Sequence, residues 1–162
     1  MQHLIKEISD FLNIEFLNII EDSESREYYG LDCSINNNHI KFRKAKLTPI
    51  KNGQFVTFWK RNSNMETEPY DFLDLFDFYL IYVQKESKRG IFVFPKDILK
   101  QKKVISNNNN EGKRGFRVYP NWDKAESAQA KKTQLWQSEY FFNFEEATNL
   151  NFNDFLKITY DK

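Results

Sequence analysis

The chain has 162 residues, of which 40% are hydrophobic and 17% aromatic, and its formal net charge is +1. This length fits one domain, residues 1–162, that can bury a core without a metal, and a single cysteine excludes an internal disulfide. No stretch approaches about 18 apolar residues, which excludes a transmembrane helix, and charged side chains interrupt any signal-peptide core. The composition therefore predicts a soluble, cytoplasmic protein with no membrane partner.

The first half of the chain predicts one helix followed by strands. Apolar residues recur at helical spacing in residues 2–13. Residues 14–21 fit either a second short helix or a strand, and a polar connection follows. Alternating or apolar runs bounded by turn signals, among them Asn52-Gly53, then predict a meander of antiparallel strands at 28–35, 39–48 and 54–61.

The second half alternates strands and helices. A nearly continuous apolar run at 76–83 predicts a central strand buried on both faces. The remaining elements, in chain order, are a helical turn near 69–75, a strand at 91–94, a helix at 96–102, a strand at 116–119, a helix at 124–141 and a weaker helix at about 145–157. This order predicts an α/β (α+β) single domain with a mixed, mainly antiparallel sheet flanked by helices.

Charge is unevenly distributed along the chain. Residues 1–38 carry two basic and eight acidic side chains, residues 39–61 carry seven basic and no acidic ones, and residues 62–83 carry five acidic and no basic ones. Residues 84–103 have a balance of +5. A near-neutral chain with such segments predicts a local anion site rather than a general polyanion binder.

In residues 39–61 the basic side chains are interleaved with aromatic ones. Side chains alternate along a strand, so the face with Ile40 and Phe42 continues into Lys44 and Lys46, which an apolar core cannot hold unpaired. We therefore expect a concave basic patch with Trp59 available for stacking; the alternative is a solvated edge pair of strands. The candidate ligand-binding residues of this segment are Arg43, Lys44, Lys46, Thr57, Trp59, Lys60 and Arg61.

Two later segments also combine charge with aromatic residues. In residues 113–120, Gly115 allows a close backbone approach beside arginine forks suited to phosphate or carboxylate. In residues 129–137, amides, a hydroxyl and an indole share one helix face, which suits a planar group. The alternatives are a strand with one polar face, and a helix whose Trp136 packs on the sheet. The candidate ligand-binding residues are Lys113, Arg114, Arg117, Tyr119, Gln129, Lys132, Thr133 and Trp136.

Candidate catalytic residues are sparse. His3 and His39 are the only histidines and lie at no metal-ligand spacing, and neither a glycine-rich phosphate loop nor a nucleophile elbow is present. The sequence therefore predicts no metal site and no cofactor, with Cys33 as a small apolar filler in a strand. In a nuclease-like hairpin, Asp32 would lie near Lys44-Ala45-Lys46, where a lysine replaces the second metal-binding carboxylate.

Several long motifs resemble the MepB family over roughly residues 24–142. They are Lys41-Phe42-Arg43-Lys44-Ala45-Lys46-Leu47-Thr48-Pro49, Gly53-Gln54-Phe55-Val56-Thr57, Trp59-Lys60-Arg61, Phe76-Asp77-Phe78-Tyr79, Phe94-Pro95-Lys96, Gly112-Lys113-Arg114-Gly115-Phe116-Arg117-Val118-Tyr119-Pro120-Asn121-Trp122, and Gln129-Ala130 with Thr133, Trp136 and Gln137. The resemblance implies a bacterial cytoplasmic protein with a restriction-endonuclease-like architecture. It implies no particular reaction.

Three functions follow as hypotheses. The leading one is binding of nucleic acid or an anionic, phosphate-bearing small molecule, with basic side chains on phosphates and Trp59, Tyr119 or Trp136 stacking. The second is a degenerate or metal-dependent nuclease that uses Asp32. The third is a protein-interaction module, such as a homodimer in which the acidic 62–83 segment meets the basic 39–61 segment. The leading hypothesis expects the three basic segments to converge on one concave face. It also expects that Arg43→Glu with Arg117→Glu abolishes binding without lowering the melting temperature.

Overall fold

The computed structural model describes residues 1–146 together with Phe152 and Leu156. Its largest element is a six-stranded mixed sheet in the spatial order β1-β2-β3-β8-β9-β11. The strands are β1 (Leu17–Glu21), β2 (Leu31–Ile35), β3 (Asn38–Lys44), β8 (Phe78–Lys85), β9 (Lys88–Pro95) and β11 (Phe141–Asn143). The β3–β8 pair is parallel, and the other neighbouring pairs described are antiparallel. This confirms the predicted mixed, mainly antiparallel sheet.

Strand β8 lies in the middle of the molecule. Phe78, Leu80 and Tyr82 belong to the apolar core on one face of the sheet, and the alternating residues of the strand belong to the core on the other face. The prediction of a strand buried on both faces is therefore confirmed.

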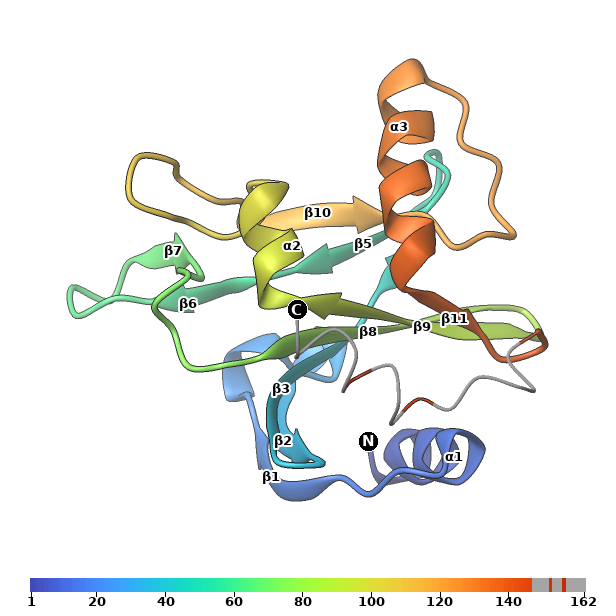
Figure 1. Ribbon diagram of the computed structural model, residues 1–162, viewed down its shortest axis with the longest axis horizontal. Coiled ribbons are helices and arrows are strands. Elements are labelled where there is room, and N and C mark those ends of the chain that lie inside the picture. Colours follow the sequence, from blue (N-terminus) through green and yellow to red (C-terminus); the bar gives the residue numbers. More distant parts are fainter. Residues whose placement is uncertain (147–151, 153–155, 157–162) are drawn as a thin grey trace.

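Helix α1 (Gln2–Leu12) covers the first of these faces (Figure 1). Ile5 and Ile8 are buried against the sheet, and the helix ends where Asn13 adopts a left-handed conformation with φ 53°. The helix predicted at residues 2–13 is confirmed, and the ambiguous residues that follow it form β1 at the sheet edge. A 3₁₀ helix, η1 (Ser23–Tyr28), then leads into β2. None of the described helices has the length and hydrophobicity that a bilayer crossing requires.

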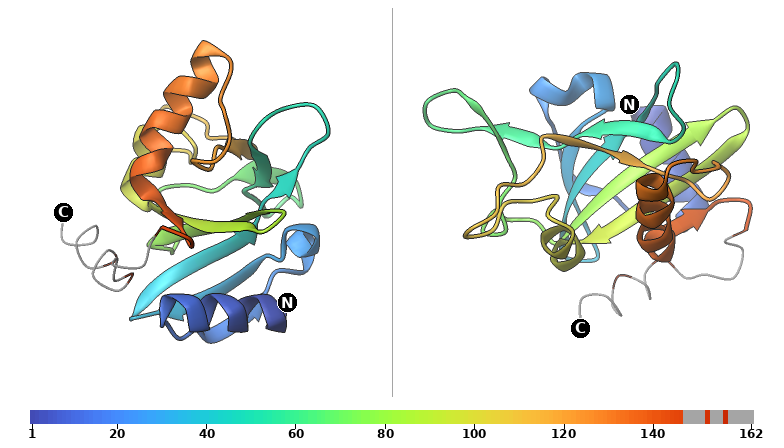
Figure 2. Two further views of the ribbon diagram at one scale, coloured as in Figure 1. Left: turned by 90° about the vertical axis from the view of Figure 1, so that its right-hand side faces the viewer. Right: turned by 90° about the horizontal axis from the view of Figure 1, so that it is seen from above.

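A second layer covers the opposite face of the sheet (Figure 2). It contains a three-stranded sheet in the order β10-β5-β4 and a two-stranded hairpin of β6 and β7. Helices α2 and α3 complete this layer, and 3₁₀ helix η2 follows α3. The bounds are β4 (Lys46–Leu47), β5 (Gln54–Thr57), β6 (Trp59–Arg61), β7 (Thr67–Pro69), β10 (Gly115–Val118), α2 (Lys96–Gln101), α3 (Ala128–Gln137) and η2 (Ser138–Tyr140).

The predicted three-stranded meander is wrong in one respect. The chain leaves the large sheet at Ala45, which is buried and separates β3 from β4. The place beside β3 is taken by β8, whose two apolar faces require a central position. Strand β5 buries Val56 but leaves Phe55 and Thr57 only partly covered, so it fits the outer layer, where it pairs with β4 and β10.

Other element boundaries differ only locally. The predicted strand at 54–61 is interrupted at Phe58, whose buried ring separates β5 from β6. The region near 69–75 forms β7 and turns, and α3 is shorter than the predicted helix at 124–141. The helix predicted at about 145–157 falls largely outside the described residues.

Candidate functional site

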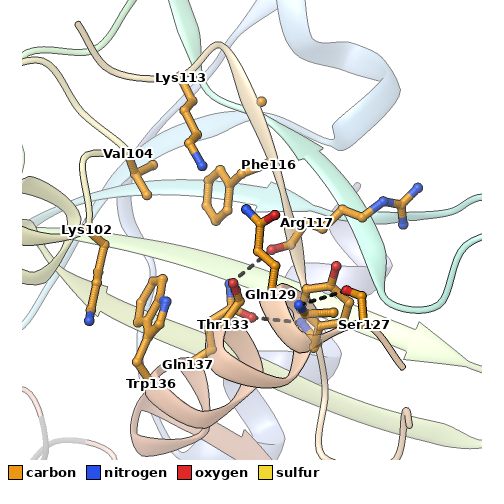
Figure 3. Close-up of a pocket in the computed structure, with 13 residues that line it drawn as sticks. Lys102, Val104, Lys113, Phe116, Arg117, Ser127, Gln129, Thr133, Trp136 and Gln137 are labelled. Atoms are coloured by element: carbon orange, nitrogen blue, oxygen red, sulfur yellow. Dashed lines mark hydrogen bonds between the residues drawn. The ribbon is translucent and has the colours of Figure 1, made fainter. Parts of the chain in front are cut away.

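A cavity of about 350 Å³ lies between β10, α3 and the loop that follows α2 (Figure 3). Its floor comes from β10 and one wall from α3, so residues far apart in the sequence meet there. The lining residues are Lys102, Val104, Lys113, Gly115, Phe116, Arg117, Tyr119, Ser127, Gln129, Ala130, Thr133, Trp136 and Gln137. This volume is at the lower end of the range for small-molecule sites.

Helix α3 is fixed against β10 by the buried amide of Gln137. Its Oε1 accepts from the backbone N–H of Tyr119 at 2.8 Å, and its Nε2 donates to the carbonyl of Arg117 at 3.0 Å. The Trp136 ring packs on Phe94 with centroids 5.4 Å apart. The α3 wall is therefore tied to the strand that forms the floor, which keeps the shape of the cavity defined.

The charge of the cavity wall is positive. The lining residues include Lys102 and Lys113 and no aspartate or glutamate. The Lys102 ammonium lies 5.6 Å from the centre of the Trp136 ring, and Figure 3 shows Lys113 extending from the loop before β10 toward Phe116. The arrangement is chemically suited to a ligand that carries both an anion and a flat ring.

Lysines around the cavity lack acidic partners. None of those in α2, in the loop after it, before β10 or in α3 has a carboxylate of the described residues within 4.0 Å. These lysines are Lys96, Lys100, Lys102, Lys103, Lys113, Lys131 and Lys132. Lys96 differs from the others because its ammonium donates to the carbonyl of Asp74. Of the rest, Lys102 and Lys113 line the cavity itself.

The basic residues of the 39–61 segment have the opposite environment, because most of them form ion pairs. The pairs are Lys41–Asp32 at 2.9 Å, Arg43–Asp22 at 3.0 Å, Lys46–Glu27 at 2.9 Å, Lys60–Asp74 at 2.6 Å and Arg61–Glu24. Acidic residues that precede or follow the segment in sequence fold back onto it. The sequence pattern therefore overestimated the free positive charge of this segment.

Arg43 requires a specific correction. Its side chain is only 1% exposed, and it donates to the carbonyl of Phe42 at 2.8 Å as well as to Asp22. An ideal Cβ placed on Gly30 would lie 3.0 Å from the Arg43 guanidinium carbon, which shows how closely the chain surrounds it. The expectation that Arg43→Glu leaves the melting temperature unchanged is therefore wrong, because that change would bury an unpaired carboxylate.

The other candidate residues of the 39–61 segment lie in two separate hollows. Lys44 and Lys46 line one of about 460 Å³ near η1, whereas Trp59, Lys60 and Arg61 line one of about 280 Å³ beside β2 and β3. Thr57 lies near Arg43 in a crevice that joins the second hollow. The expected convergence of three basic segments is thus wrong for the first segment.

The two later segments do converge on the cavity, with exceptions. Lys113, Tyr119, Gln129, Thr133 and Trp136 all line it. Arg117 contributes to the lining, but Figure 3 shows its guanidinium directed away from α3, where it donates to the carbonyl of Asn52 at 3.2 Å. Arg114 binds the carbonyl of Thr67 at 2.9 Å, and Lys132 is exposed on α3 outside the lining.

Comparison with known proteins identifies the family of the chain. A family model described as MepB-like matches residues 22–143. The chain belongs to the MepB-like family. The crystal structure of MepB is 32% identical, covers 93% of this chain and 99% of its own, and has a TM-score of 0.79. A bacterial homing endonuclease matches at 13% identity over 86% of this chain and 87% of its own, with a TM-score of 0.45. No curated protein sequence matches the chain.

Within this MepB-like chain, sequence reasoning missed part of the cavity. Lys102, Val104, Phe116, Ser127 and Ala130 also line it. The positive balance of residues 84–103 was a signal for Lys102, but nothing in the sequence showed that the end of α2 lies opposite α3. The small residues at the start of α3 carry no chemical signature of their own.

The residues considered for catalysis are either already hydrogen-bonded to another side chain or buried. Asp32 accepts from Lys41 at 2.9 Å, and Cys33 is a buried free thiol whose pKa is raised to about 12 by burial and by the neighbouring Asp32 carboxylate. Among the residues that the structure describes, no group of three or more His, Cys, Asp and Glu is placed to hold a metal ion. Metal-dependent cleavage that requires Asp32 stays a prediction.

Proposed function

We propose that this MepB-like protein binds a phosphate-bearing ligand, a single strand of nucleic acid in particular, on the face formed by α2, β10 and α3. One observation carries the proposal: Lys102 and Lys113, which form no ion pair with a described carboxylate, line a cavity together with aromatic rings and no carboxylate. Elsewhere on the chain, basic side chains are mostly neutralised. An anion binds most favourably where positive charges are gathered.

The chemistry of the cavity matches the two parts of a nucleotide. Ammonium groups attract phosphates without regard to sequence, and the rings of Phe116, Tyr119 and Trp136 lie within the same lining. Base stacking on aromatic side chains is the usual companion of phosphate contacts in single-strand binders. The cavity therefore supplies both kinds of contact within one nucleotide's reach.

The distribution of lysines favours a strand over a free nucleotide. Lys103, Lys131 and Lys132 do not line the cavity, yet they lie directly after α2 and in α3, the elements that flank it. A ligand confined to about 350 Å³ would leave these cations without contacts. A chain of successive phosphates would contact them on both sides of the cavity.

The test is a fluorescence-anisotropy titration of labelled single-stranded DNA, duplex DNA and RNA at two salt concentrations, with free nucleotides as competitors. The variant Lys102→Gln/Lys113→Gln/Lys132→Gln is compared with Lys6→Gln/Lys44→Gln/Lys88→Gln, which removes the same number of charges from α1, β3 and β9, away from the elements that form the cavity. Each lost phosphate contact lowers the salt slope of single-strand binding by about 0.7. We expect at least tenfold weaker binding and a slope reduced by about 2 for the first variant only.

Three outcomes would contradict the proposal. If no oligonucleotide or nucleotide binds at low salt, the lysine surface does not serve phosphates. If a free nucleotide binds as tightly as an oligonucleotide, the ligand is a small phosphate-bearing molecule, and the proposal of a nucleic-acid strand as the ligand is wrong. If the test variant and the control variant weaken nucleic-acid binding equally, the binding surface lies elsewhere.

A further inference from the structure

Two polar side chains on the cavity side of α3 have no protein partners. The amide of Gln129 and the hydroxyl of Thr133 line the cavity and make no hydrogen bond with any described residue. The other two glutamines of α3 are engaged, because Gln134 donates to the carbonyl of Pro120 at 3.0 Å and Gln137 ties the helix to β10. Gln129 and Thr133 are therefore free to hydrogen-bond with a ligand.

These two groups differ chemically from the lysines of the cavity. An ammonium only donates, and in the proposed function it contacts phosphate, whereas an amide and a hydroxyl both donate and accept. A sugar hydroxyl has the same double capacity. Within a nucleic-acid strand the 3′- and 5′-oxygens are bonded to phosphorus, so the 2′-hydroxyl of RNA is the sugar hydroxyl that is left to match them.

The position of the two groups fits the order of the parts of a nucleotide. Gln129 and Thr133 are one helical turn apart, and Trp136 follows within the next turn, so the three side chains share one side of α3. Figure 3 shows Gln129 extending toward Phe116, toward which Lys113 also extends. The sugar of a nucleotide joins its phosphate to its base. A phosphate at Lys113 and a base against the Trp136 ring therefore bring the sugar to Gln129 and Thr133.

We propose that Gln129 and Thr133 bind the 2′-hydroxyl of a ribonucleotide, and that the protein prefers RNA to DNA for this reason. The inference rests on the proposed function, because it names the kind of strand whose phosphates the lysines contact. It requires no particular base, since the sugar is the same in all four ribonucleotides.

The size of the preference follows from the hydroxyl that DNA lacks. The Thr133 side chain is half-buried, so a deoxynucleotide in the cavity covers its hydroxyl without offering a partner. The net effect of one hydrogen bond on an equilibrium is about two- to tenfold. We therefore expect about fivefold tighter binding of RNA. The salt slopes of RNA and DNA should be equal, because their phosphate contacts are the same.

The experiment compares strands that differ only at the 2′ position of the sugar. Labelled homopolymers of uridine, deoxyuridine and 2′-fluoro-deoxyuridine, each of about 12 nucleotides to suit single-strand site sizes, are titrated by fluorescence anisotropy at one pH and two salt concentrations. The fluoro sugar keeps the conformation of ribose but has no hydroxyl, so it separates a hydroxyl contact from the shape of the strand. We expect the uridine strand to bind about fivefold more tightly than either of the others.

The outcomes separate this inference from the proposed function. Equal affinities of the uridine and deoxyuridine strands at a steep salt slope would overturn the ribose preference and leave the proposed function standing. A fluoro strand that binds as tightly as the uridine strand would also overturn the hydroxyl contact, because the preference would then come from the shape of the strand. If no strand binds, the proposed function itself is wrong.

Two pairs of variants locate the contact. Thr133→Val removes the hydroxyl and keeps the shape of the side chain, whereas Thr133→Ser keeps the hydroxyl. Gln129→Met removes the amide from the lining, and Gln101→Met makes the same change on α2 outside the lining. We expect the first variant of each pair to lower the preference for uridine toward unity and the second to retain it, with thermal melting to verify that all four are folded. A full preference in both first variants would show that this cavity does not bind the 2′-hydroxyl.

Discussion

At the scale of single residues, Arg43 and Lys46 show what the sequence pattern conceals. Both belong to one basic segment, and both pair with a carboxylate of the preceding acidic region. Arg43 is 1% exposed, whereas Lys46 is 43% exposed and its partner Glu27 is 79% exposed. Alternation along a strand places Arg43 and Lys46 on opposite faces. It could not show which one is buried, because the acids that meet them come from η1 and the turn before it, outside the strand. The predicted candidates Lys113, Thr133 and Trp136 do line the cavity, and their role in binding a ligand stays a prediction.

This difference in burial predicts different costs of removal. Arg43→Met leaves the partly buried Asp22 carboxylate without its partner, and we expect it to lower the free energy of unfolding by about 3 kcal/mol. Lys46→Met removes an exposed pair that water screens, so a loss of at most about 1 kcal/mol is expected. Urea unfolding of both variants measures the two values. Equal losses in the free energy of unfolding would mean that the buried Arg43 does not stabilise the start of η1, contrary to what its contacts indicate.

At the scale of elements, local patterns predicted which segments form strands and helices but not all of their neighbours. The helix at 2–13 and the buried strand at 76–83 follow from apolar periodicity, which is a local property. The pairing of β5 with β10 joins segments about 60 residues apart (Gly115 beside Thr57), and no local pattern encodes it. The cavity depends on that pairing, since β10 forms its floor. The sequence alone therefore could not predict the cavity, although it did predict several of the residues that line it.

The Gln137 amide is the contact between elements whose loss should be most visible. Gln137→Leu leaves the Tyr119 N–H and the Arg117 carbonyl without the side-chain partners that they have in the structure. We expect a loss of about 1–3 kcal/mol in the free energy of unfolding. Gln129→Leu, on an exposed position of the same helix, should change stability by less than about 0.5 kcal/mol. If urea denaturation gives the two variants the same midpoint, α3 is not held by this amide.

At the scale of the whole molecule, the acidic and basic segments neutralise each other within one chain. Lys60 of the 39–61 segment contacts Asp74 and Glu68 of the 62–83 segment, at 2.6 and 3.6 Å. The complementary charges that suggested two copies therefore meet inside a single copy, and association into a homodimer stays a prediction. Lys102 and Lys113, which line the cavity, form no such ion pair with a described carboxylate.

The buried groups of the sheet make stability depend on alkaline pH. Burial, together with the Asp32 carboxylate, raises the pKa of Cys33 to about 12, and burial raises the pKa of Tyr82 to about 12. Burial also raises the pKa of Tyr79. In the unfolded chain these groups lose their protons near their ordinary values of 9.0 and 10.0. Between these values and about 12 the folded chain binds more protons than the unfolded chain, so stability falls as pH rises.

We therefore expect the free energy of unfolding to be insensitive to these groups below about pH 9, and to fall by about 1.4 kcal/mol per pH unit for each group whose unfolded form has ionised. Urea unfolding from about pH 8 to about pH 11 measures the decline. Cys33→Ala lowers stability at every pH because it removes buried sulfur, but it should also delay the onset of the decline to about pH 10, where only the tyrosines contribute. An unchanged slope between about pH 9 and pH 10 in this variant would show that the thiol is not shielded from solvent in the folded protein, and would place Cys33 among the accessible groups of the molecule.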